Sequence, residues 1–178
     1  MKQICLFLML GVFSLTAFGQ NKVAKSKRHY YVDINDSSFV AAMPENGATM
    51  RGYFRNDTIY RIETWFGFNF GEVTRVYYYW KGELSLVNET QKLYNAKAVS
   101  KEQSDSIKVS YTGRYIFKNR TLTDISQKGT YSISDTPSSK EETQAALLML
   151  SDKYLGLLYD RRNEKKNRHK IKGDADEQ

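Results

Sequence analysis

Histidines and carboxylates are the residues from which an enzymatic site in this chain would be built. There are two histidines, His29 and His169, and each lies in or beside a basic end of the chain. Neither stands near a cysteine, and the sequence contains no H-E-x-x-H pair and no metal-like group of carboxylates. A Ser-His-Asp hydrolase needs a histidine held by the fold, and neither position offers one. We therefore predict no metal centre, no cofactor and no catalytic triad.

Pairs of carboxylates are the remaining route to catalysis. On neighbouring strands, two of them would face each other as in a glycoside hydrolase. Exposed strand positions also carry glutamate for solubility, so the pattern favours a protein without enzymatic activity. A carbohydrate-active hydrolase using Glu63 or Glu83 is the alternative. The carboxylates on or near predicted strands are Glu63, Glu72, Glu83 and Asp124.

Aromatic side chains give the strongest indication of binding. The chain has 13 Tyr, 9 Phe and 2 Trp, more than one small core normally uses. Strand alternation along residues 77–80 places Tyr77 and Tyr79 on one face and the other two aromatics on the opposite face. If a helix covers that opposite face, Trp65, Tyr77 and Tyr79 form a surface for a sugar, a peptide or another protein. A sheet that curls or pairs with residues 29–47, burying both faces, is the alternative.

The elements that would position these residues are strands. Between residues 48 and 134 the apolar pattern has period two, and aromatic and β-branched residues dominate. Three turns repeat one form, in which an aromatic residue and a base precede Asn or Gly; they contain Asn56, Gly82 and Asn119. Asn and Gly tolerate the positive φ of tight hairpins, so each turn predicts a hairpin. The sequence therefore predicts an antiparallel β-meander of six to eight strands.

After residue 138 the period changes to that of a helix. Residues 139–142 read Ser-Lys-Glu-Glu, a capping-box pattern. Apolar residues then recur at spacings of three and four, which predicts a helix from Lys140 to Arg162 or beyond. We expect an α+β domain over residues 29–160, with one C-terminal amphipathic helix packed on the sheet. The apolar stripe of this helix consists of Leu147, Leu150, Tyr154, Leu155 and Leu158.

The N-terminus predicts export. A positive start, the apolar run 4–18 and small residues ending at Gly19 are typical of a secretory signal peptide, residues 1–19, cleaved after Gly19. The run is shorter than the roughly 20 residues that span a bilayer, so we expect no transmembrane span in the mature chain. The single cysteine, Cys5, is removed with the signal peptide. Secreted chains without cysteine are typical of a bacterial periplasm or cell surface, so we expect a periplasmic or extracellular protein.

Positive charge is concentrated at the two ends of the chain. The formal net charge is +7, but the basic segment 20–28 carries four bases and no acid, and the charged tail 161–178 carries seven bases against four acids. The part between them is nearly neutral, so we predict no nucleic-acid partner. Peripheral contact of the tail with an anionic envelope surface is one interpretation, and a solvated helix end that aids solubility is the other. The bases of the tail are Arg161, Arg162, Lys165, Lys166, Arg168, Lys170 and Lys172.

Several segments share features with a group of exported proteins. The end of the signal at 18–20, the hairpin sequences 77–84 and 113–119, and the leucine-rich segment 140–160 together resemble uncharacterised exported β-meander proteins of Bacteroidota. The resemblance covers about residues 70–160 and implies a location and a fold, without any catalytic residue. The basic extension 161–172 departs from it. We predict an exported, non-enzymatic module that binds a protein, peptide or glycan, with envelope tethering through the tail as a further alternative.

Overall fold

The described part of the computed structural model comprises residues 29–94, 108–131 and 139–175, with side chains as far as Glu164. Its strands form one sheet in sequence order, and each strand is antiparallel to its neighbours. The predicted α+β meander with one C-terminal helix is confirmed. The predicted signal peptide and the basic segment 20–28 lie outside the described residues. The elements are β1 (His29–Ile34), the short 3-10 helix η1 (Ser37–Phe39), β2 (Ala48–Arg55), β3 (Thr58–Phe68), β4 (Gly71–Trp80), β5 (Glu83–Leu93), β6 (Lys108–Lys118), β7 (Thr121–Gly129) and α1 (Lys140–Ala175).

The three predicted hairpin turns are present. Asn56 has φ 58°, and Lys81 and Asn119 have φ 52° and 49° at the first positions of their two-residue turns. Gly82 follows at φ 86°, where a side chain would be strained. Each hairpin also has an irregular register just before its turn in β2, β4 or β6. Such bulges increase the local twist, which lets a sheet curve around an element packed on it.

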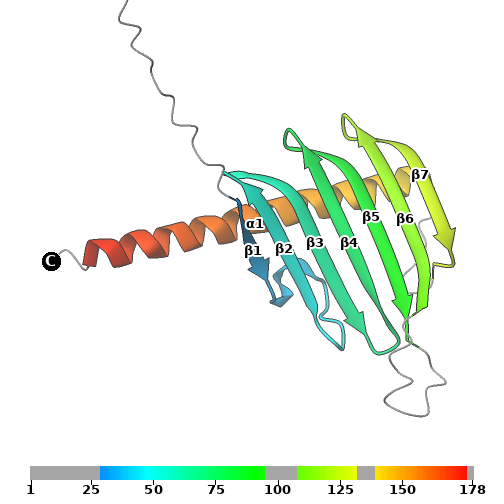
Figure 1. Cartoon of the computed structure of the whole chain (residues 1–178), viewed down its shortest axis with the longest axis horizontal. Coiled ribbons are helices and arrows are strands. Elements are labelled where there is room, and N and C mark those ends of the chain that lie inside the picture. The colour runs from blue at the N-terminus through cyan, green and yellow to red at the C-terminus, as the bar shows by residue number, and fades with distance from the viewer. Residues whose placement is uncertain (1–28, 95–107, 132–138, 176–178) are drawn as a thin grey trace, which may run out of the picture.

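Helix α1 is that element, and it crosses a single face of the sheet. In Figure 1 it starts beside β7, passes behind the strands and leaves the sheet at β1. We call this face the covered face and the opposite one the open face. The core lies between α1 and the covered face, where Ile62, Tyr77, Val87 and Tyr115 stand side by side across β3–β6 and are all buried.

The sequence of α1 explains how it packs. The Ser139 hydroxyl accepts a hydrogen bond from the Glu142 amide at 3.1 Å, which is the predicted N-terminal cap. Leu158 lies directly over Gly52 of β2, where a Cβ would stand 2.6 Å from a leucine methyl. The glycine therefore permits close approach of helix and strand. The helix residues buried against the sheet are Thr143, Leu147, Ser151, Tyr154 and Leu158. Three of them belong to the predicted stripe, whereas its other members, Leu150 and Leu155, are only partly buried.

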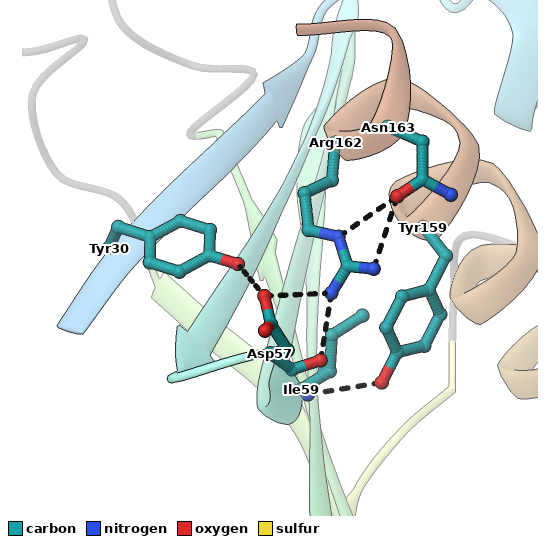
Figure 2. A network of polar contacts seen from close by, with 6 residues as sticks. All are labelled: Tyr30, Asp57, Ile59, Tyr159, Arg162 and Asn163. Carbon is teal, nitrogen blue, oxygen red and sulfur yellow. Dashed lines mark hydrogen bonds and ion pairs between the residues drawn. The ribbon is translucent and has the colours of Figure 1, made fainter. Parts of the chain in front are cut away.

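Farther along, α1 is fixed to the β2–β3 hairpin by polar contacts. Figure 2 shows Arg162 reaching the hairpin, where it donates to the Asp57 carbonyl oxygen at 2.8 Å and lies 3.5 Å from the Asp57 carboxylate. The Tyr159 hydroxyl accepts from the Ile59 amide at 3.3 Å. The Arg162 guanidinium also stands over the ring of Tyr159, and its side chain is only 15% exposed. This residue joins the helix to the sheet.

Helix α1 extends beyond the predicted boundary between the domain (29–160) and the charged tail (161–178). It continues without interruption to Ala175 and so includes most of residues 161–178. In Figure 1 its last turns extend past β1. Within the described part of the chain, no helix has an apolar stretch long enough to cross a membrane.

Candidate functional site

Two of the three aromatic residues predicted to line a binding face lie in the core instead. Tyr77 is completely buried and packs edge-on against Tyr154 of α1, at 5.6 Å between ring centroids. Tyr79 is 7% exposed, and its hydroxyl shares a 2.9 Å hydrogen bond with Ser151. Burial raises the pKa of both phenols, which keeps them neutral. The prediction that these two tyrosines face away from the helix is therefore wrong.

The error comes from the register between β3 and β4. Alternation within β4 correctly groups Tyr77 with Tyr79, but it does not say which residues of β3 share their face. The two strands pair Phe68 with Gly71, which leaves a two-residue turn and places Tyr77 opposite Ile62 rather than beside Trp65. A register shift of one residue would exchange the two faces.

Trp65 does lie on the open face, and it is held there from two sides. The six-membered ring of its indole lies over Gly67, where a Cβ would stand 2.5 Å from the ring. The indole N–H donates to Glu72 at 2.9 Å, and Glu72 is in turn bound by the Lys92 ammonium at 2.8 Å. These contacts fix the indole on the sheet surface in one orientation.

An open pocket of about 510 Å³ surrounds Trp65. We call it the Trp65 pocket. It extends over β1–β4, from the edge strand β1 to the inner strand β4. Its walls combine one aromatic ring with a guanidinium, carboxylates, hydroxyls and an amide, so a ligand would meet hydrogen-bonding groups around one apolar plate. The open-face residues that line it are Asp33, Asn35, Thr49, Arg51, Glu63, Trp65 and Thr74.

The charged groups of the Trp65 pocket hold one another in place. The Arg51 guanidinium makes two hydrogen bonds to Asp33, at 2.6 and 3.1 Å, and lies 4.4 Å from the ring centroid of Tyr31. Glu63 accepts from the Tyr53 hydroxyl at 2.7 Å and also pairs with a neighbouring arginine. A surface that is ordered before its ligand arrives loses less conformational entropy on binding.

The carboxylates predicted for a hydrolase are not brought together by this geometry. Glu63 lines the Trp65 pocket, whereas Glu83 begins β5 at a hairpin turn and is exposed. Hydrogen bonds from Lys92 and Trp65 lower the pKa of Glu72 below its ordinary value of 4.5. A glycosidase acid requires the opposite shift. The described residues also contain no group of three or more His, Cys, Asp or Glu positioned to hold a metal ion.

A buried polar cluster on the covered face was not predicted. The Arg75 Nε donates to Glu89 at 2.8 Å, and Gln91 donates to the same carboxylate at 2.9 Å. Glu89 and Gln91 are 3% and 0% exposed. Because the guanidinium and the amide satisfy both carboxylate oxygens, the cluster serves to pair charges inside the fold.

The basic residues of the tail fall into two groups. Arg161 pairs with Asp36 at 2.5 Å, and Arg162 is bound to the β2–β3 hairpin, so these two contact the folded domain instead of standing free for an anionic surface. The remaining five, Lys165, Lys166, Arg168, Lys170 and Lys172, continue the helix backbone, and their side chains lie outside the described part.

Asp33, Thr49 and Arg51 are pocket residues that the sequence analysis missed. The predicted turn at Asn56 pairs Phe54 with Ile59, but the bulge between Tyr53 and Phe54 shifts the register by one residue and places Arg51 opposite Glu63 and Thr49 opposite Trp65. Because the turn alone predicts the unshifted register, it would not have found them. Asp33 was hidden because β1 is short and reaches β2 only after a long connection.

Comparisons of the chain with protein-family models, with curated proteins and with solved structures found no match.

Proposed function

We propose that this protein is an exported, non-enzymatic module that binds a glycan on the open face of its sheet. The observation that carries the proposal is the Trp65 indole, fixed over Gly67 and by Glu72 inside a pocket of polar side chains. Export rests on the sequence of residues 1–19 and on the resemblance to exported Bacteroidota proteins.

The chemistry of the Trp65 pocket suits a saccharide. A sugar ring has an apolar face of C–H groups that packs against an aromatic plane, and hydroxyls around its edge that need hydrogen-bond partners. Trp65 offers the plane, and Asp33, Arg51 and Glu63 offer charged acceptors and donors around it. Since these groups are already held in position, binding costs little side-chain entropy.

A peptide suits this pocket less well. Extended peptides gain most of their affinity by adding a strand to a free sheet edge, whereas amphipathic helices need an apolar groove. Of the strands under the pocket, only β1 has a free edge, and Trp65 lies two strands away from it on β3; β2–β4 are paired on both sides, so their backbone groups are already used. Only side chains are available, and most of them are polar.

The two tryptophans provide the test and its control. Trp65 lies in the pocket, whereas Trp80 is 71% exposed at a hairpin end. The mature protein is screened on an array of neutral and acidic glycans, and affinities for the ligands found are measured by calorimetry. We expect Trp65→Ala to weaken binding by about tenfold or more, the scale of a lost aromatic contact at the centre of a site, and Trp80→Ala to leave it unchanged.

A second variant separates the position of the indole from its presence. In Gly67→Ala the new methyl group would stand 2.5 Å from the Trp65 ring and must displace it. We expect weaker binding than wild type although the indole remains, and no further loss when the change is added to Trp65→Ala. Absence of any glycan ligand, or equal affinities of Trp65→Ala and wild type, would refute the proposal.

A further inference from the structure

A second pocket lies on the same open face, over β5, β6 and β7. It encloses about 320 Å³, and we call it the Arg114 pocket. It contains no aromatic ring and is lined by small hydroxyl and amide groups together with two cations. Its open-face residues are Asn88, Thr90, Thr112, Arg114, Ser126 and Lys128.

The two cations of this pocket differ from those near Trp65. Arg51 and Lys92, on the same face, are each bound to a carboxylate. Arg114 and Lys128 are exposed, and neither makes an ion pair or a side-chain hydrogen bond with any described residue. Glu89 lines the pocket but directs its carboxylate to the covered face and to Arg75. Asp124, two residues before Ser126 on the same face of β7, forms no ion pair with either cation. Among the described residues, the two cations of the Arg114 pocket therefore have no carboxylate partner.

The strand register connects the two pockets. Trp65 stands opposite Thr74, which stands opposite Thr90 and then Thr112, and the row ends at Lys128. Neighbouring strands lie about 4.8 Å apart, so β3 and β6 are separated by about 14 Å. A row of threonine hydroxyls therefore extends across the sheet from the Trp65 indole to Arg114 and Lys128.

We propose that the two pockets are subsites for one acidic polysaccharide chain, which stacks a sugar on Trp65 and places a carboxylate or sulfate group between Arg114 and Lys128. The inference rests on the proposed glycan-binding function and deepens it. A guanidinium binds such an anion through two parallel hydrogen bonds, and the lysine adds a point charge. A span of about 14 Å requires a chain of several sugars, because a single one cannot touch both pockets.

Charge arrangement favours this occupant over other polyanions. Nucleic acids and anionic membranes bind through many bases spread over a surface. Away from the strand ends, the described part of the open face has unpaired cations only in this pocket, at the end of a polar row, and the bases beside Trp65 are neutralised by carboxylates. Such a surface suits a ligand with widely spaced negative charges and neutral hydroxyl groups between them.

The test compares acidic polymers with neutral partners. Binding of the mature protein is measured to polygalacturonic acid and its methyl ester, and to dextran sulfate and dextran, at about 0.05 and about 0.5 M NaCl. We expect each acidic polymer to bind more tightly than its neutral partner, and the difference to shrink at high salt. The first pair reports on carboxylates and the second on sulfates.

A pair of double variants separates recognition from net charge. Arg114→Gln/Lys128→Gln removes the free cations, whereas Lys81→Gln/Lys118→Gln removes two exposed charges from hairpin ends. We expect the first to lower affinity for the acidic polymers about tenfold, as for lost charge-assisted hydrogen bonds, and the second to have little effect. Equal loss in both variants, or equal binding of acidic and neutral polymers, would overturn the inference.

The outcome also distinguishes this inference from the proposed function. If neutral glycans bind in a Trp65-dependent way and the Arg114→Gln/Lys128→Gln variant matches wild type, glycan binding stands and the acidic subsite is wrong. If no polysaccharide binds, both are wrong. Binding only to anionic lipid vesicles or to DNA would assign these cations to another class of partner and would also contradict the inference.

Discussion

Trp65 depends on three neighbours, and each has a separate physical role. Gly67 leaves room for the indole on the sheet, Glu72 accepts its N–H, and Lys92 holds the carboxylate in place. Because the indole donates its hydrogen bond to a carboxylate that Lys92 holds by an ion pair, the geometry of the pocket depends on the ionisation of Glu72. Protonation of Glu72 in acid should therefore loosen the contacts that hold Trp65.

The direction of this pH effect follows from the pKa shift. The pKa of Glu72 is lowered in the folded protein by hydrogen bonds from Lys92 and Trp65. A carboxylate with a lowered folded pKa stabilises the fold above its ordinary value of 4.5 and loses that contribution as the pH falls through the lower, folded value. We expect the free energy of unfolding to fall over this acid range, and to fall less in Glu72→Gln.

Urea denaturation from about pH 6 to about pH 3 measures the effect. Glu45→Gln is the control, because Glu45 is exposed in the connection between β1 and β2. It should reproduce the pH dependence of wild type. A Glu72→Gln curve that runs parallel to wild type throughout would show that the Glu72 contacts do not contribute.

At the scale of elements, the contact of α1 with β2 decides how closely helix and sheet approach. Leu158 is completely buried over Gly52, so a methyl group at that position has no free space. Gly156 lies nearby on the exposed side of the same helix, where an added methyl would touch nothing within 4 Å. These two glycines should respond to the same substitution with opposite signs.

We expect Gly52→Ala to destabilise the protein by about 1–3 kcal/mol, because overpacking forces Leu158 or the strand to move. Gly156→Ala should stabilise it by about 0.5–1 kcal/mol, because alanine loses less backbone entropy in a helix. Chemical denaturation of both variants checks the pair. A Gly52→Ala protein as stable as wild type would contradict the close contact described between Leu158 and β2.

Strands β2–β7 and the helix could be predicted from the sequence because local signals determine them, whereas β1 lies before the region of period two and was not predicted. Positive-φ residues at Asn56, Gly82 and Asn119 identified the hairpins, and Ser139 identified the start of the helix. The faces were harder to predict. Assigning Tyr77 required the register across the turn at 69–70, where neither turn residue has the positive φ of the other hairpins.

Long-range contacts were the other part that local patterns could not supply. Arg161 and Arg162 belong to a basic run that resembles a solvated tail, yet they bind Asp36 and Asp57, more than a hundred positions earlier. Asp33 enters the Trp65 pocket only because β1 pairs with β2. Such contacts arise from tertiary packing, so composition and periodicity within one segment do not reveal them.

At the scale of the whole molecule, the two faces of the sheet have different roles. One face is covered by α1 and carries the core, including the buried tyrosines and the Arg75–Glu89 pair. No described helix covers the other face, which carries both pockets (Figure 1). The core and the proposed binding surface thus lie on opposite sides of one sheet, so changes in the pockets should alter affinity without unfolding the protein.

Nuclear magnetic resonance of the mature protein during titration with an oligogalacturonate tests this division most directly. The two indole N–H signals are separate reporters, because Trp65 lies in the pocket and Trp80 stands exposed at a hairpin end. We predict that the Trp65 signal and the amides around Thr90 and Thr112 shift, while Trp80 and the amides of α1 stay in place. Shifts confined to α1 or to Trp80, with Trp65 unchanged, would contradict binding on the open face.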